Sequence, residues 1–405
     1  MKKYGLFEVC GIEVEYMVAD KETLEIMPIS DFMLDRLVEM NNGGDPLTGS
    51  VEWSHELVAH VAEAKCASPV PSVGAELEPW NAALKTVNGI LAEKGACLLP
   101  SAAHPWMNPA SAVLWQHEDR EIYEQYDRIF GCNTHGWTNL QSVHINLPFA
   151  DDEEFGRLHA AIRVAMPLIP ALAASSPYLD GKFTGCMDAR MVEYTRNSLR
   201  VPSMTGPLIP EPIFTREEYE EKIFKTIFKE TAPFDPDGIL NGEWANARGA
   251  IARFDRGAVE IRVMDSQESP QADLGAVFAV TALVKLIAEE RFASIDSLKT
   301  WSAEKLRGLF FAAVKGAETA SVPDPDYTAL FGITGNSGVS FGGIWKRLFE
   351  LPEFNSGVFG RYFENYLRHG SLAARFFRRA GADPDRKALE SFMRELRDVN
   401  GLLLS

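Results

Sequence analysis

Gly11-Ile12-Glu13-Val14-Glu15-Tyr16 alternates apolar and charged side chains along the chain. This period of two predicts a β-strand with one buried face and one polar face. Glu13 and Glu15 then stand about 7 Å apart on the polar face. Two like charges on one strand face repel each other unless water or a cation separates them. The stretch therefore predicts a sheet with an apolar side for the core and a charged side suited to a site.

Two further stretches repeat this pattern far along the chain. In residues 257–265, Glu260 and Arg262 share one face of the expected strand, and apolar residues occupy the other face. In residues 143–147, His144 and Asn146 share one face. Each polar face, taken alone, is compatible with simple exposure to solvent. The accumulation of acids, an arginine, a histidine and an asparagine on matched alternations favours an α+β protein, in which helices back a sheet whose other face forms an open site.

The bulk composition limits the classes of partner. The chain has 405 residues, of which 46% are hydrophobic and 24% charged, as is typical of a globular protein with one large or two ordinary domains. Its net charge of −17 argues against nucleic acid and against an anionic membrane surface as partners. An acidic protein still binds ATP when metal ions supply the positive charge. We therefore expect small-molecule ligands, no nucleic acid and no membrane.

The expected compartment is the cytoplasm. Met1 to Tyr4 lead directly into the first strand, without the pattern of a signal peptide. The longest apolar run, residues 274–288, is interrupted by Thr281 and Lys285, so we expect no membrane span. The five cysteines are widely spaced and include no C-x-x-C pair. This usage fits a reducing environment and neither a disulfide framework nor a zinc site.

Helical periodicity marks much of the remaining chain. The first expected helix is capped by Ser30 or Asp31, and the last helix of the sheet-bearing part is capped by Asp273. The expected helices span 30–40, 76–94, 118–130, 152–174, 216–228 and 273–290. After about residue 291, short helices alternate with joints that contain Pro or Gly. We therefore divide the chain into a catalytic sheet domain, 1–290, and a helical C-terminal segment, 291–405, packed on the same domain.

Three local features are open to more than one interpretation. The stretch 336–343, rich in Gly and Ser, is either a plain surface loop or a segment that orders over a ligand. His104, followed by Pro and Trp, is expected to belong to a structural turn rather than to a catalytic group. Glu56 and Glu63 are seven residues apart, which places them on one face of a helix but on one face of a strand only if a bulge intervenes.

Three common catalytic or nucleotide-binding motifs are missing from the sequence, which narrows the chemistry that it can perform. The sequence contains no P-loop, no dinucleotide-binding fingerprint and no hydrolase nucleophile elbow. Four carboxylates remain on the expected polar sheet face, and oxygen ligands suit Mg²⁺ or Mn²⁺, which bind phosphates. Arg262 suits a phosphate or a carboxylate, because its planar guanidinium binds either one through two parallel hydrogen bonds. The four carboxylates are Glu13, Glu15, Glu63 and Glu260.

Several motifs, taken in order, resemble one known family. The chain is similar to the glutamate–cysteine ligase type 2 family, also called carboxylate–amine ligases, over roughly residues 8–290. Residues 141–149 resemble the plant-type members more than bacterial members with two histidines in this strand. The residues that carry the resemblance are Gly11 to Tyr16, Glu56 through Glu63, Ala103 to Trp106, Ser175 to Lys182 and Gly257 to Asp265.

The resemblance implies a fold and a reaction. The fold is that of the catalytic domain of glutamine synthetase, an antiparallel sheet curved into a half-funnel with helices on its outer face. The reaction is an ATP-dependent ligation, in which a glutamate-type carboxylate is phosphorylated and an amine then displaces phosphate to give an amide. Mg²⁺ or Mn²⁺ is the implied cofactor, and ATP the co-substrate. The acceptor could be cysteine, another amino acid or an amine on a peptide.

The resemblance also implies roles for individual residues. Glu13, Glu15, Glu63 and Glu260 match the acidic metal positions, and Arg262 with Glu260 forms the catalytic pair. His144, Asn146, Arg190 and Arg253 are expected to face substrate or ATP. His144 could also be a strand filler, and Arg190 a structural ion-pair partner. The roles of Arg248 and Arg253 are in doubt, because the segment before Gly257 departs from the family's Trp-Asp-x-Arg pattern.

Two rival functions and the oligomeric state stay open. A metal-dependent hydrolase of γ-glutamyl amides would use the same metal face without ATP. A non-catalytic nucleotide-binding homologue would keep the fold but not the chemistry, although the full set of acids argues against it. A homo-oligomer is compatible with the sequence.

Overall fold

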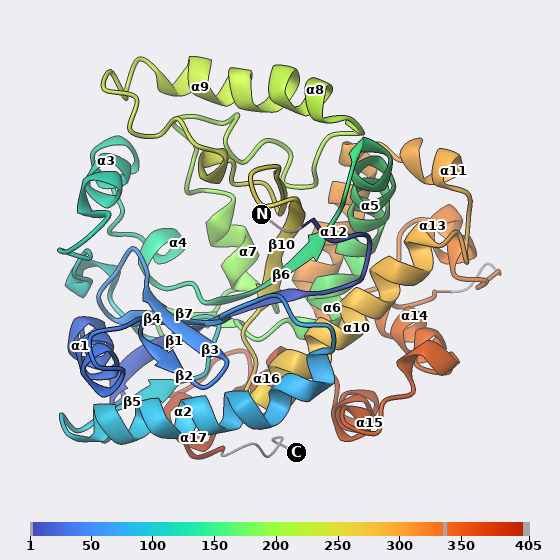
Figure 1. Cartoon of the computed structure of the whole chain (residues 1–405). Coiled ribbons are helices and arrows are strands. Elements are labelled where there is room, and N and C mark those ends of the chain that lie inside the picture. The colour runs from blue at the N-terminus through green and yellow to red at the C-terminus, as the bar shows by residue number, and fades with distance from the viewer. Residues whose placement is uncertain (1–2, 335–337, 400–405) are drawn as a thin grey trace.

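The computed structural model describes residues 3–334 and 338–399. Among them, one large antiparallel sheet runs in the order β2-β3-β4-β1-β6-β10-β9, with β5 paired to β1 beside β4. Helices surround this sheet, so the expected α+β class with an antiparallel sheet is confirmed (Figure 1). Its strands are β1 Gly11–Asp20, β2 Leu47–Thr48, β3 Val51–His55, β4 Val61–Cys66, β5 Ala96–Leu99, β6 Ser142–Pro148, β9 Ala250–Arg253 and β10 Ala258–Asp265. A separate short pair comprises β7 Tyr178–Leu179 and β8 Lys182–Phe183.

The helices follow the sequence periodicity closely. Helices α11 to α17 make up most of the described chain after residue 291, as expected. The α-helices before that point are α1 Ser30–Met40, α2 Leu77–Ala92, α3 Arg120–Phe130, α4 His135–Thr138, α5 Asp152–Ala165, α6 Ile169–Ala173, α7 Ala189–Tyr194, α8 Arg216–Tyr219, α9 Lys225–Thr231 and α10 Pro270–Ala288. The later ones are α11 Ile295–Lys299, α12 Ala303–Gly316, α13 Pro325–Leu330, α14 Phe341–Leu348, α15 Gly360–His369, α16 Leu372–Ala380 and α17 Arg386–Asp398.

The apolar face of the sheet lies against the helices that form the core. Ile12 and Val14 on β1 and Ile145 on β6 are at most 1% exposed. Helix α10 packs on β6 and on α5, and α5 also contacts β10. Because side chains alternate along a strand, burying these residues turns Glu13 and Glu15 to the opposite face of the sheet. The core on one face thus fixes the position of the charged site on the other.

Helix α10 begins earlier than the sequence predicted. Its first residue is Pro270, and Ser269 caps it by accepting a hydrogen bond from the Ala272 amide. The prediction of Asp273 as the cap was wrong, because the Asp273 carboxylate instead accepts a hydrogen bond from the Gln267 amide, 2.7 Å away. Proline fits the first turn of a helix, where its missing N–H has no intrahelical partner to lose.

Helix α10 is also long and apolar enough to resemble a membrane span, although the sequence predicted no such segment. Over an 18-residue window its mean hydropathy is 1.6, so length and composition alone would allow it to cross a membrane. In the described chain, 72% of that window is buried by the protein itself. A helix that packs on a sheet and on several neighbouring helices acquires the same composition for a different reason, namely burial in the core.

Prolines interrupt the helix predicted over residues 152–174. Helix α5 ends at Ala165, a 3-10 turn covers Met166–Leu168, and α6 then continues to Ala173. Pro167 and Pro170 lack the N–H that would continue the ladder, so the chain changes its helical form there. At the start of α1, Ile29 occupies the cap position without a side-chain hydrogen bond, so the predicted cap by Ser30 or Asp31 was also wrong.

The C-terminal helices share the core of the sheet-bearing part. The Trp345 indole donates a hydrogen bond to the Leu168 carbonyl, and the Tyr327 hydroxyl donates to the Val164 carbonyl. Of the stretch 336–343, residues 336 and 337 lie outside the described residues. Residues 341–343 form the first turn of α14, and Ser340 caps this helix. These residues are therefore neither a plain surface loop nor a loop that orders over a ligand.

His104 lies in a structural turn. It is 0% exposed, its Nε2–H donates to the Leu24 carbonyl at 2.7 Å, and its Nδ1 accepts from the Trp106 amide at 3.3 Å. Burial lowers the pKa of His104 to about 4. Both ring nitrogens are used by the neutral form, so a second proton would break the contact with Trp106.

We expect this histidine to make the fold sensitive to acid. Its pKa is lower in the folded chain than in the unfolded chain, so its contribution is fully present above pH 6.5 and is lost as the pH falls toward 4. We expect His104→Asn to flatten the fall in unfolding free energy over this range by on the order of 2 kcal/mol. Urea unfolding at several pH values measures this slope. An unchanged slope would show that His104 does not contribute to the acid sensitivity.

Candidate active site

The sheet register brings the predicted residues onto one face. Glu13 on β1 pairs directly with His144 on β6, and Asn146 pairs with Glu260 on β10. On the other side of β1, Glu15 pairs with Glu63 on β4. Directly opposed residues on one sheet face have Cβ atoms about 5 Å apart, so residues up to 131 positions apart in sequence become neighbours. The alternation predicted each face, and the pairing assembled the site.

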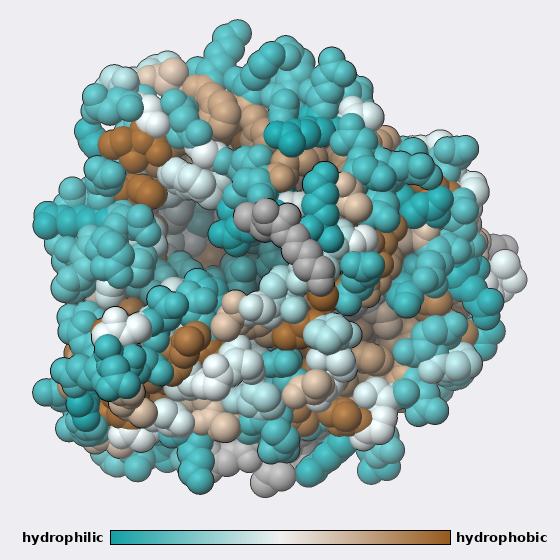
Figure 2. All heavy atoms as spheres, in the orientation of Figure 1, coloured by the Kyte–Doolittle hydropathy of each residue, from teal (hydrophilic) through white to brown (hydrophobic). Residues whose placement is uncertain are grey.

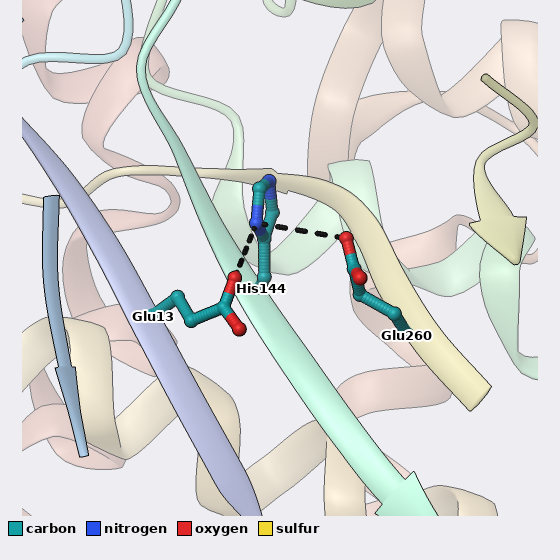
Figure 3. Close-up of side chains that lie close together, drawn as sticks. All are labelled: Glu13, His144 and Glu260. Carbon is teal, nitrogen blue, oxygen red and sulfur yellow. Dashed lines mark hydrogen bonds and ion pairs between the residues drawn. The ribbon is translucent and has the colours of Figure 1, made fainter. Parts of the chain in front are cut away.

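Three of these residues converge at the centre of the face. Glu13, His144 and Glu260 come from three adjacent strands, and their side chains point toward one another (Figure 3). His144 Nδ1 lies 3.1 Å from Glu13 Oε2 and 3.8 Å from Glu260 Oε1. Asn146 donates to the other Glu13 oxygen at 3.1 Å. In the described chain, this is the group whose potential metal-ligating atoms all lie within 4.8 Å of one another.

The central group carries mutually stabilising charges. Burial opposes ionisation of Glu13, but the hydrogen bond and charge of His144 outweigh it and lower the Glu13 pKa to about 2. Burial likewise opposes the charged form of His144, and the neighbouring carboxylates outweigh it and raise the His144 pKa. The pKa of Glu260 is lowered despite burial, chiefly by the charge of Arg262. His144 therefore acts here as the counter-charge of a buried acidic group.

A second acidic group lies beside the first. Burial, followed by the charges of Glu63 and Glu15, raises the pKa of Glu56 well above its usual value. Burial and the charge of Glu13 do the same for Glu63, whose carboxylate accepts a hydrogen bond from Ser54 at 2.8 Å. Glu56 lies in the turn between β3 and β4, so neither a shared helix nor a bulged strand relates it to Glu63. It was not among the predicted site residues.

The donors on this face fit a hard divalent cation. Carboxylate oxygens are the protein ligands that suit Mg²⁺ and Mn²⁺. Burial, followed by neighbouring carboxylates, raises the pKa of Glu56 and of Glu63, and a bound cation would favour their ionised forms. The residues that could hold such ions are Glu13 and Glu260 in one group, beside which His144 supplies a counter-charge, and Glu15, Glu56 and Glu63 in the other.

Two arginines contact Glu260, one from its own strand β10 and the other from the neighbouring strand β9. Arg262 Nη2 donates to Glu260 Oε1 at 2.5 Å, and Arg253 Nη1 donates to Glu260 Oε2 at 3.3 Å. Both arginines line the same cavity as the acids. Arg248 does not, because it binds Glu211 through two hydrogen bonds of 2.6 and 2.7 Å and is 3% exposed. Arg248 and Arg253 therefore differ in role. Arg253 lies at the site, and Arg248 supports the fold.

Arg190 lies between the cavity and the buried core. It borders the cavity but is only 1% exposed. Its Nε donates to Asp265 at 2.5 Å, and both of its terminal nitrogens donate to the main-chain carbonyl of Arg262 at 3.3 Å. Contact between Arg190 and substrate stays a prediction. The geometry matches the structural ion-pair partner that was the alternative.

The cavity has a volume of about 630 Å³ and two unlike walls. One wall is the charged sheet face. The other is largely aromatic and comes from α3, α4, α7 and the turn before β9, and the space-filling view shows this face of the molecule hollowed near its centre (Figure 2). Sequence reasoning missed this wall, because nothing local marks these rings as facing a site. The missed lining residues include Tyr123, Tyr126, Trp137, Tyr194, Trp244 and Arg256.

One cavity therefore joins an acidic sheet face to the two arginines beside it, and comparison with known proteins indicates the carboxylate–amine ligase class. The family model described as glutamate-cysteine ligase family 2 matches residues 9–321. The chain belongs to this family.

Individual relatives agree with the family. An uncharacterized protein of Archaeoglobus fulgidus is 35% identical over 69% of this chain and 75% of its own length. A putative glutamate–cysteine ligase 2-1 of Nocardioides is 27% identical over 73% of this chain and 72% of its own length. The crystal structure of a glutamate–cysteine ligase from Francisella tularensis, in complex with AMP, superimposes with a TM-score of 0.65 at 12% identity and covers 98% of this chain and 90% of its own. At this identity the structural likeness shows the fold alone.

Proposed function

We propose that this protein is an ATP-dependent ligase that phosphorylates a glutamate-type carboxylate and condenses it with an amine, giving a γ-glutamyl amide. The observation that carries the proposal is the cavity in which Arg262 and Arg253 stand beside an acidic face suited to divalent cations. Acids alone would suit many metal enzymes. Acids and arginines on one sheet face suit a reaction in which phosphate oxygens and a substrate carboxylate must be held at the same time.

The proposed reaction has two halves. The side-chain carboxylate of the acid attacks the γ-phosphorus of ATP, and ADP leaves as the acyl phosphate forms. The amine nitrogen then attacks the acyl carbon, phosphate leaves, and the nitrogen loses a proton to yield the amide. Mg²⁺ or Mn²⁺ held by the two acidic groups would neutralise the negative charge on the phosphates.

The chain's own groups would orient the reactants. Arg262 and Arg253, which both donate to Glu260, could each also bind a phosphate or carboxylate oxygen, because both line the cavity. His144 would keep Glu13 and Glu260 ionised, since its pKa is raised by these same carboxylates. The aromatic wall would exclude water from the acyl phosphate, and exclusion of water protects a reactive intermediate from hydrolysis.

The test is a product assay. The protein is incubated with Mg-ATP, glutamate and a pool of amines, and ADP and new amides are measured by mass spectrometry. We expect ADP formation to require glutamate, an amine and the metal, and to stop when EDTA is added. Cleavage of γ-glutamyl amides in metal alone would identify the rival hydrolase. Binding of Mg-ATP without turnover of any amine would identify a non-catalytic homologue.

A further inference from the structure

Arg262 lies in an irregular part of β10. The pairing of β10 with β6 shifts register between Ile261 and Met264, so one extra residue stands on β10 opposite His144. A bulge of this kind re-aims side chains and releases a main-chain group from the ladder. The Arg262 amide still donates to the Gly249 carbonyl at 3.0 Å. The Arg262 carbonyl instead accepts from the Arg190 guanidinium.

Arg190 is itself held by a buried network. Asp265 Oδ1 accepts from Arg190 Nε, and Asp265 Oδ2 accepts from the Ser175 amide and the Ser176 hydroxyl, both at 2.8 Å. The Ser176 hydroxyl also accepts from the Arg190 amide at 3.1 Å. Arg190 and Asp265 are each 1% exposed, so water does not compete for these bonds. The network therefore fixes the Arg190 guanidinium rigidly against the bulge.

Resting on the proposed ligase function, we propose that Arg190 is a positioning residue: it holds the main chain of the β10 bulge through the Arg262 carbonyl and thereby aims the Arg262 guanidinium into the cavity. Two guanidinium nitrogens of Arg190 donate to the Arg262 carbonyl while a third donates to Asp265, and only the planar, forked guanidinium of arginine offers this arrangement. Lysine keeps the positive charge but cannot span both acceptors in this geometry. Arg190 is thus expected to act on the reaction through Arg262 and not through its own contact with substrate.

A double-mutant cycle tests this dependence. We expect Arg190→Lys to lower kcat by about tenfold in the parent, with little change in KM for ATP, because misaimed Arg262 chiefly weakens transition-state contacts. In an Arg262→Lys background the same change should cost less than about twofold, because residues that act through one another are not additive. An equal loss in both backgrounds would overturn the proposal and return Arg190 to the substrate-contacting residues.

Arg248→Lys is the matched control. It also removes a buried arginine fork, here from Glu211, but lies outside the cavity. We expect it to lower the melting temperature about as much as Arg190→Lys does, with kcat unchanged. A fall in kcat that simply follows the loss of melting temperature in both variants would show a structural role only, and would also overturn the proposal.

A crystal structure of the Arg190→Lys variant gives a readout that needs no activity. We expect the Arg262 side chain to leave its position beside Glu260. An unmoved Arg262 would overturn the positioning role even if the parent proved active. If the parent shows no ligase activity while Arg262 does move, the proposed function fails and the positioning inference survives, so the two failures can be distinguished.

Discussion

Arg262→Lys is expected to fold like the parent and to lose at least about two orders of magnitude in kcat/KM, which corresponds to roughly 3 kcal/mol of transition-state stabilisation. The guanidinium donates to Glu260 at 2.5 Å and faces the cavity beside Arg253. Lysine keeps the charge but offers a single ammonium, so it cannot bind Glu260 and a phosphate or carboxylate oxygen in the same planar arrangement.

Steady-state kinetics and circular dichroism measure the two parts of this expectation. Arg36→Lys is a suitable control, because Arg36 also contacts a glutamate, Glu39 at 2.7 Å, but does so on the surface. Exposed ion pairs contribute little to stability, so this control should behave like the parent. Near-full activity of the Arg262 variant would remove Arg262 from the catalytic residues.

Glu15→Gln should leave the protein without ligands as stable as the parent, or slightly more stable, and should abolish most of the stabilisation given by Mg-ATP. Glu15 stands opposite Glu63, and its charge contributes to the raised pKa of Glu56. Glutamine removes this repulsion, and its oxygen can still accept the 2.7 Å bond from the Ser142 amide. A ligand at a hundred times its Kd stabilises by about 2.7 kcal/mol, and a hundredfold weaker affinity would remove nearly all of this.

Thermal melts of both proteins, with and without Mg-ATP, measure the two effects, and product formation is assayed in parallel. Glu78→Gln removes an exposed acid from α2 and serves as the control for charge alone. An unchanged Mg-ATP shift in Glu15→Gln would contradict the role of Glu15 in holding the cation. If ATP never shifts the melting temperature of the parent and γ-glutamyl amides are cleaved in metal alone, the hydrolase replaces the ligase.

Much of the site could be predicted from short stretches of sequence. The alternation around Glu13 and Glu15, around His144, and around Glu260 and Arg262 predicted which side chains share a polar face, and the structure places them on one face. Alternation is a local property, because each residue's direction depends on its immediate neighbours in the strand. The same locality explains why α1 and α2 lie within two residues of their predicted positions.

Other features have no local signal. Glu56 reaches the acids through the turn between β3 and β4, and the aromatic wall comes from α3, α4, α7 and the turn before β9, none of which belongs to the strands that carry the acids. Their approach depends on how separate elements pack, and the pattern within each element does not encode that packing. The prediction of Asp273 as a helix cap was wrong for a related reason. Its carboxylate could cap a helix, but in the fold it accepts a hydrogen bond from the Gln267 amide instead.

The sequence by itself determined the two-faced strands, the oxygen-rich chemistry of the polar face and the family to which the chain belongs. Only the tertiary structure decided which acids stand together, that Arg253 joins the site while Arg248 binds Glu211, and that Arg190 holds the carbonyl of Arg262. The physical reason is the range of the forces involved. Side-chain direction is fixed by the backbone of a few residues, whereas the choice of partner for a charged group depends on register, bulges and burial across the whole sheet.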